Sequence, residues 1–83
     1  MCYLITFISK DLLSPKNEVF IENEKRKITE KYKYKFRLYD GDGILYFEGI
    51  SKVNQTFEPL DDFGEAYGCT EIRYLEKNKY ISL

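Results

Sequence analysis

Two carboxylates and two glycines stand together at residues 40–43, between two apolar stretches. Carboxylates at alternate positions of a glycine-containing loop can ligate a calcium ion. An EF-hand loop beginning at Asp40 would need an oxygen ligand at its fifth position and a glutamate at its twelfth, but these positions hold Ile44 and Ser51. We therefore interpret the stretch as a tight turn between two strands and predict no metal site, with weak divalent-ion binding as the alternative.

The chemistry of this turn predicts a register for the two strands. Glycine adopts a positive φ without steric cost, so Gly41 and Asp42 fit the central positions of a type II′ hairpin turn. Counting outward pairs apolar side chains on one face and puts an opposite-charge pair and a cation–π pair on the other. The expected partners are Leu38 with Leu45, Phe36 with Phe47, Lys35 with Glu48 and Arg37 with Tyr46.

Acids and aromatic rings are combined in residues 57–68. Two carboxylates can act as acid and base when one occupies an apolar pocket that raises its pKa, but no other side chain completes a catalytic set. Because proline and glycine interrupt the segment, we predict an irregular loop with one helical turn at most, anchored by its apolar residues. Such a loop is suited to protein recognition. The predicted protein-binding residues are Asp61, Asp62, Phe63, Glu65 and Tyr67.

Lysine and arginine alternate with aromatic rings in residues 31–37, KYKYKFR. Proteins bind single-stranded nucleic acid with cations that contact its phosphates and with aromatic rings that stack on its bases. In an extended strand this alternation puts rings and charges on opposite faces, which predicts a half-buried strand with a basic solvent face. That basic face is the alternative binding site, for nucleic acid. Its residues are Lys25, Arg26, Lys27, Lys31, Lys33, Lys35 and Arg37.

The residue types that are missing narrow the chemistry further. The 83 residues include no histidine, the commonest general base and a common metal ligand. Cys2 and Cys69 lie far apart and lack the spacing of a metal or redox motif. They could form one long-range disulfide, two buried thiols or one thiol of each exposure, and we favour reduced thiols. We expect no enzyme, no cofactor and no metal.

The elements that position these residues are predicted to be mostly strands. Tyrosine and phenylalanine make up 17% of the chain and favour half-buried sheet positions. Ser14 and Pro15 fit a helix start, and residues 19–30 are either a short helix or a strand with a polar loop. The predicted fold is one α+β, mostly β domain over residues 1–83, with an antiparallel meander sheet, an added N-terminal strand and at most one short helix. Strands are predicted at residues 2–8, 31–40, 44–51, 69–76 and 79–83.

Charge and length limit the function classes. The net charge of −1 combines nine lysines and arginines against five acids in residues 1–37 with four against nine in residues 38–83. The opening apolar run is too short to span a bilayer and lacks the positive start of a signal peptide, so we expect a cytoplasmic protein without a membrane partner. We predict a non-enzymatic protein-interaction module, such as a phage or mobile-element accessory protein or inhibitor that binds a host protein. The alternative is a nucleic-acid-binding module, and pairing of the edge strand at residues 79–83 would give a homodimer.

Overall fold

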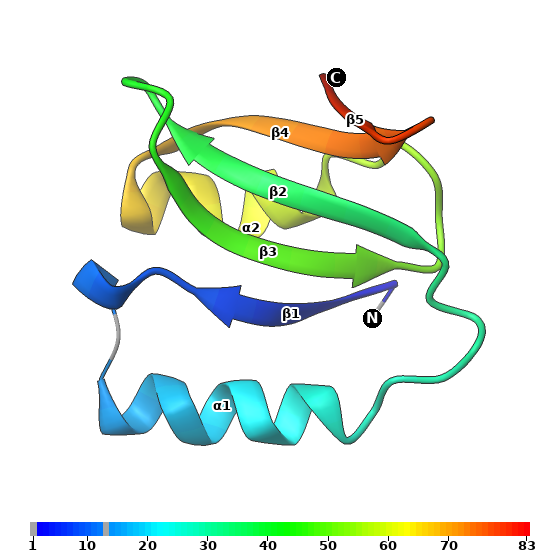
Figure 1. Cartoon of the computed structure of the whole chain (residues 1–83). Helices are drawn as coiled ribbons and strands as arrows, with labels where there is room; N and C mark the ends of the chain where they lie inside the picture. Colours follow the sequence, from blue (N-terminus) through cyan, green and yellow to red (C-terminus); the bar gives the residue numbers. More distant parts are fainter. Residues whose placement is uncertain (1, 13) are drawn as a thin grey trace.

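The computed structural model describes residues 2–12 and 14–83, which form one sheet and two α-helices (Figure 1). The predicted mostly β, α+β class is confirmed. The elements are β1 (Tyr3–Ile8), a 3₁₀ turn (Lys10–Leu12), α1 (Pro15–Lys25), β2 (Tyr34–Asp40), β3 (Leu45–Ser51), α2 (Glu58–Tyr67), β4 (Cys69–Glu76) and β5 (Lys79–Ser82). Across these two ranges, no helix is long and apolar enough to cross a membrane.

The five strands form an antiparallel sheet in the order β1-β3-β2-β4-β5. β2 with β3 and β4 with β5 are hairpins, as the sequence predicts. The predicted continuous meander is wrong, because after β3 the chain passes behind the sheet through α2 and returns as β4 on the other side of β2 (Figure 1). β1 is likewise connected to β2 through α1, with β3 between them. The sheet therefore consists of two interleaved β-α-β units and a final hairpin strand.

The turn between β2 and β3 lies where the sequence predicts it, but its type and register differ. The glycine with positive φ is Gly43 (φ 79°) instead of Gly41, and its N–H donates to the carbonyl of Asp40 at 3.1 Å. A left-handed glycine after the turn adds one residue to the hairpin as a bulge. A second register irregularity, between Leu38 and Tyr39, shifts the pairing by one residue more, so the four predicted pairs are wrong by two residues. The observed partners are Leu38 with Phe47, Phe36 with Gly49 and Arg37 with Glu48.

The prediction of at most one short helix is wrong, since α1 has 11 residues and α2 has 10. α1 begins as predicted, with Pro15 in the first turn and the hydroxyl of Ser14 accepting the N–H of Asn17 at 3.3 Å. Of the ambiguous residues 19–30, those as far as Lys25 belong to this helix.

α2 replaces the loop predicted at residues 57–68. Pro59 lies in the first turn, where a missing N–H costs no helical hydrogen bond. Gly68 ends the helix in the left-handed conformation (φ 76°) and donates its N–H to the carbonyl of Gly64. The residues that suggested a loop are thus the start and stop signals of a helix.

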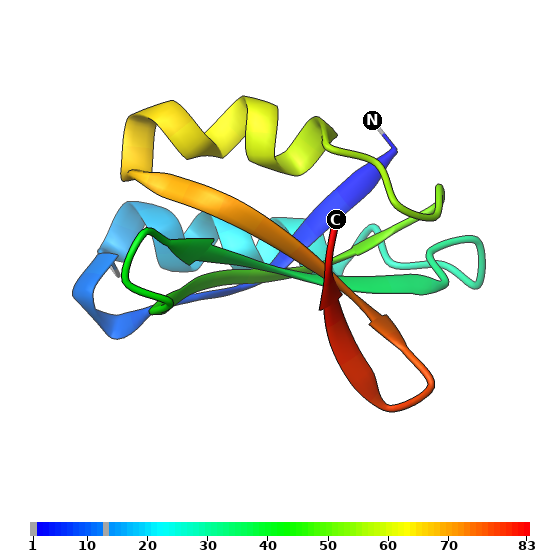
Figure 2. The same ribbon diagram turned by 90° about the horizontal axis from the view of Figure 1, so that it is seen from above.

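The core lies between α2 and one face of the sheet. Figure 2 shows α2 over this face, while the opposite face carries no helix of the described chain. The predicted alternation of β2 is confirmed, with Phe36 and Leu38 fully buried and Lys35 exposed, although the strand begins at Tyr34 and not at residue 31.

α1 covers the outer edge of β1 (Figure 1). The carboxylate of Glu24, only 2% exposed, accepts the backbone N–H of Ile5 at 3.4 Å and pairs with Lys27 Nζ at 3.3 Å. Free N–H groups on an edge strand invite pairing with other chains. The helix therefore closes this edge of the sheet with a buried acid.

Candidate functional site

α2 separates the acids and the apolar residues of its segment onto opposite sides. Leu60, Phe63 and Tyr67 stand at helical spacing and pack partly buried against the core. The acids stand at i, i+3, i+4 and i+7 and are all exposed. This spacing is visible in the sequence and could have identified the helix. We call these four acids the acidic face: Glu58, Asp61, Asp62 and Glu65.

The two aromatic rings of the predicted protein-binding set point inward. The ring centroids of Phe63 and Tyr67 lie 5.2 and 5.1 Å from that of Phe47. Their half-exposed sides line a small apolar hollow of about 170 Å³ between the two helices. The hollow is lined by Ile8, Lys16, Asn17, Phe20, Phe47, Phe63 and Tyr67.

Two residues of the N-terminal segment hold acids of α2 in place. The hydroxyl of Tyr3 donates to Asp62 at 2.5 Å, and the thiol of Cys2 donates to Glu58 at 2.7 Å. Burial raises the pKa of Tyr3, and the Asp62 carboxylate raises it further. Burial and the Glu58 carboxylate raise the pKa of Cys2 in the same way. Both donors therefore stay protonated near neutral pH.

The cysteines show no sign of activation. Both are free thiols, one partly exposed at Cys2 and one buried at Cys69, which matches one of the three sequence alternatives. Burial raises the pKa of Cys69 to about 11. A nucleophilic cysteine needs the opposite shift, because the thiolate is the reactive form.

Asp61 and Glu65 are the two acids of the acidic face that neither Tyr3 nor Cys2 holds. The ion pairs within residues 2–12 and 14–83 join Lys27 to Glu24, Arg37 to Glu48 and Arg73 to Glu71, all outside α2. α2 itself contains no lysine or arginine. The acidic face therefore presents its negative charge to solvent without a cation from the described chain.

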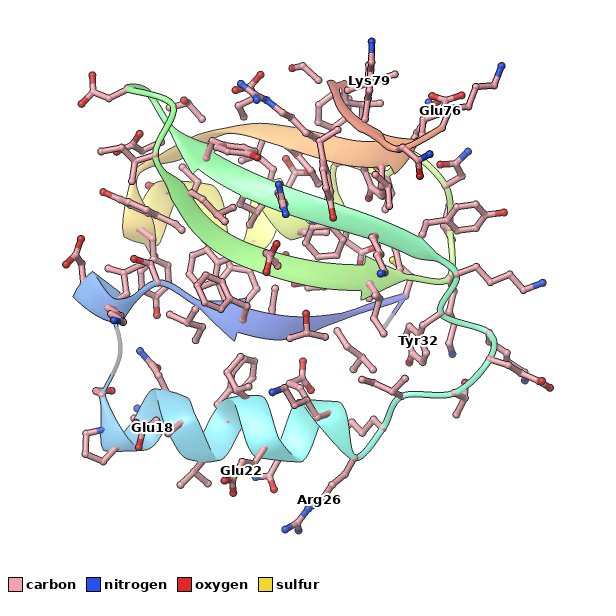
Figure 3. The ribbon with its side chains drawn as sticks, in the orientation of Figure 1. Glu18, Glu22, Arg26, Tyr32, Glu76 and Lys79 are labelled. Atoms are coloured by element: carbon pink, nitrogen blue, oxygen red, sulfur yellow. The ribbon has the colours of Figure 1, made fainter. Side chains whose placement is uncertain are left out.

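The structure divides the predicted basic residues among three places. Lys25, Arg26 and Lys27 lie at the end of α1, Lys31 and Lys33 lie in the linker before β2, and Lys35 and Arg37 lie on the open face of the sheet. Figure 3 shows Arg26 pointing away from the sheet.

One basic cluster forms where this linker meets the end of β3. Lys52 Nζ lies 5.0 Å from the ring centroid of Tyr32, which Figure 3 shows at this end of the molecule. A hollow of about 450 Å³ opens here, lined by Glu30, Lys31, Lys33, Tyr34 and Lys52. Sequence reasoning missed Lys52, because its neighbourhood depends on the pairing of β2 with β3. We call Lys31, Lys33 and Lys52 the basic cluster.

The open face of the sheet holds two arginines that are bound in place. The guanidinium of Arg37 lies 3.9 Å from the ring centroid of Tyr80 and donates to Glu48 at 2.7 Å, in place of the predicted pairing with Tyr46. The hydroxyl of Tyr39 and the Glu48 carboxylate raise the pKa of Arg37.

Arg73 has the same kind of surroundings. It lies 4.2 Å from the ring centroid of Tyr39 and donates to Glu71 at 2.9 Å, and this hydrogen bond lowers the pKa of Glu71. Two carboxylates thus offset the two arginines, so this face is less basic than the β2 sequence alone suggests.

Asp40 stabilises the hairpin turn. Its Oδ1 accepts the backbone N–H groups of Asp42 at 2.9 Å and Ile44 at 2.8 Å, and these bonds lower its pKa. In the part of the chain that the structure describes, no three side chains of the metal-binding types lie close enough together to hold an ion.

These features define a small α+β domain with a five-stranded antiparallel sheet, one acidic helix and one basic end. No protein-family model matches the sequence, and no curated protein or solved structure matches it significantly. Its function is therefore inferred from its own surfaces.

Proposed function

We propose that the protein is a small, non-enzymatic interaction module of the cytoplasm whose acidic face binds a basic surface of another protein. An accessory protein or inhibitor from a phage or mobile element that occupies a host protein would act in this way. The observation that carries the proposal is the exposure of four carboxylates on one side of α2, with no cation in that helix.

The acidic face has the properties of a recognition surface. It lies on a helix that packs against the sheet, so its carboxylates are held in a fixed pattern. The hydrogen bonds from Tyr3 to Asp62 and from Cys2 to Glu58 fix two of them further. A cluster of one charge sign attracts an oppositely charged partner at long range and speeds association. The neighbouring apolar hollow can accept one apolar side chain of the same partner.

The test is capture of a partner from a nuclease-treated lysate of the organism that encodes the protein. The double variant Asp61→Asn, Glu65→Gln removes two charges without changing side-chain size. We expect a defined protein to bind the wild type and to be lost with this variant. Glu18→Gln, Glu22→Gln is the matched control, because it makes the same change four residues apart on exposed positions of α1. A partner retained by the first variant, or lost with both, would contradict the proposal.

A second candidate function, binding of single-stranded nucleic acid, is supported by the basic cluster. Its lysines surround a hollow beside Tyr34, and Tyr32 lies under Lys52. This combination of cations and rings suits phosphates and bases. We favour the acidic face over this second candidate because Glu30, whose negative charge repels phosphates, also lines the hollow.

Salt dependence distinguishes the two candidates. Binding of a fluorescent oligonucleotide through the basic cluster should weaken steeply with added salt. The double variant Lys31→Gln, Lys33→Gln should reduce the slope of log affinity against log salt concentration by about one to two. Absence of oligonucleotide binding at low salt would remove the second candidate.

A further inference from the structure

The two edges of the sheet differ in whether another element covers them. α1 covers the β1 edge, where the carboxylate of Glu24 accepts a hydrogen bond from the N–H of Ile5. β5 forms the opposite edge and, among the described strands, pairs with β4 alone. Figure 2 shows that the β4–β5 hairpin twists away from α2, so no described element covers it. An uncovered edge is a template for another strand.

The backbone groups that β5 offers follow from its pairing with β4. The N–H of Leu83 donates to the carbonyl of Ile72 at 3.1 Å. In an antiparallel pair, alternate residues direct their backbone groups to the same side. Ile81 and Leu83 therefore face β4, whereas Tyr80 and Ser82 direct two N–H and two C=O groups outward.

The side chains of β5 are also incompletely covered. Ile81 is opposite the buried Tyr74 in the β4–β5 register, yet it is 49% exposed, and Leu83 is 39% exposed. These two side chains are exposed because α2 packs chiefly against β4, the neighbouring strand. The apolar surface of the core thus continues onto the edge strand without a partner.

We propose that β5 pairs antiparallel with β5 of a second copy, about a twofold axis at Ile81. Tyr80 then lies opposite Ser82 of the partner subunit, and Ser82 lies opposite the partner's Tyr80. All outward groups of these residues are used, because each such pair exchanges two hydrogen bonds. Ile81 meets the partner's Ile81 in a non-hydrogen-bonded pair, where side chains approach most closely. The two sheets become one ten-stranded sheet.

Charge is compatible with a second copy as the occupant, and it favours the antiparallel direction. Lys79 is the charged residue of β5, and Figure 3 shows it beside Glu76 at the hairpin end. In the proposed register the two copies of Lys79 lie four residues apart along the strands, about 13 Å, beyond the roughly 8 Å screening length of physiological salt. Parallel in-register pairing would bring them to about 5 Å. The twofold contact is also closed, so it gives a dimer and no fibre.

Sedimentation equilibrium tests the association. Because the shared edge is short, we expect a monomer–dimer equilibrium that shifts toward dimer as the protein concentration rises to about 1 mM. Ile81→Lys should leave a monomer at all concentrations, whereas Val19→Lys, the same change at a 58% exposed position of α1, should behave as wild type. A wild-type monomer throughout, or a dimer unaffected by Ile81→Lys, would overturn the proposal.

Disulfide crosslinking tests the register. In a Cys2→Ser background, Ile81→Cys should form a crosslinked dimer on oxidation, since paired Cβ atoms at such a site lie about 4.5–5.5 Å apart. Tyr80→Cys should crosslink far less, because its opposite residue is Ser82. Equal crosslinking at both positions, or none at residue 81, would overturn the proposed register.

Discussion

Arg37 and Arg73 are direct cross-strand partners in β2 and β4. Like charges opposite one another destabilise a sheet. Here each guanidinium is bound by its own glutamate and stacks on its own tyrosine, which offsets the repulsion. The open face of the sheet is therefore a balanced polar network that depends on its carboxylates.

The first prediction concerns this balance. Glu48→Gln should lower the free energy of unfolding by about 0.5–1 kcal/mol, because Arg37 loses a partly exposed ion pair beside another arginine. Urea unfolding with and without added salt measures it, and the loss should shrink as salt screens the repulsion. Glu22→Gln, at an exposed position of α1, should change little. An equal loss in both variants would argue against the network.

The second prediction concerns the covered edge. Glu24→Ala should destabilise the fold by about 1–3 kcal/mol, because it leaves the N–H of Ile5 without an acceptor. Glu24→Gln keeps an acceptor oxygen and should cost less. Chemical denaturation gives both values, and hydrogen exchange at Ile5 should quicken in the alanine variant. Unchanged exchange there would contradict the role of Glu24.

The third prediction concerns the close approach of strands β1, β2 and β3. A Cβ at Gly49 would collide with the buried ring of Phe36 and the carbonyl of Leu4. Gly49→Ala should therefore cost about 1–3 kcal/mol. Gly41→Ala is the control, since the nearest atom to its Cβ beyond the adjacent residues would be Thr70 Oγ1 at 4.0 Å, an ordinary contact. Thermal or urea unfolding of the two variants compares them, and similar stabilities would contradict this packing.

The fourth prediction concerns pH. The N–H groups of Ile44 and Asp42 lower the pKa of Asp40 below its ordinary value of 3.8, so its charged form stabilises the folded state. This contribution is present above that value and is lost as the pH falls through the folded pKa. Urea midpoints of wild type and Asp40→Ala should therefore differ most near neutral pH and converge as the pH falls below 3.8. A difference between the two midpoints that does not change with pH would indicate that the charge of Asp40 does not contribute to stability.

Local chemistry made much of the fold predictable. The alternation of Phe36 and Leu38 with charged residues identified β2, and Ser14 with Pro15 marked the start of α1. The tight turn at Lys77 and Asn78 also formed as expected, with both residues at positive φ. These features depend on side chains and backbone preferences within a few residues of each other.

α2 shows where a local interpretation fails. Pro59 and Gly68 predict a loop when each is interpreted locally, although the helical spacing of Leu60, Phe63 and Tyr67 is present in the same segment. The helix is favoured because the sheet offers an apolar face for these side chains to cover, and most helix stability in proteins comes from such packing. That face exists only when β2, β3 and β4 are paired.

The sequence by itself determined the mostly β class, the hairpin positions, the start of α1 and the residue types available for binding. Only the tertiary structure decided the strand order, the two-residue shift in register and the separation of the acidic face from the basic cluster. The physical reason is that periodicity specifies which side of an element is apolar, whereas strand neighbours and surface charge clusters arise from contacts between residues far apart in the chain.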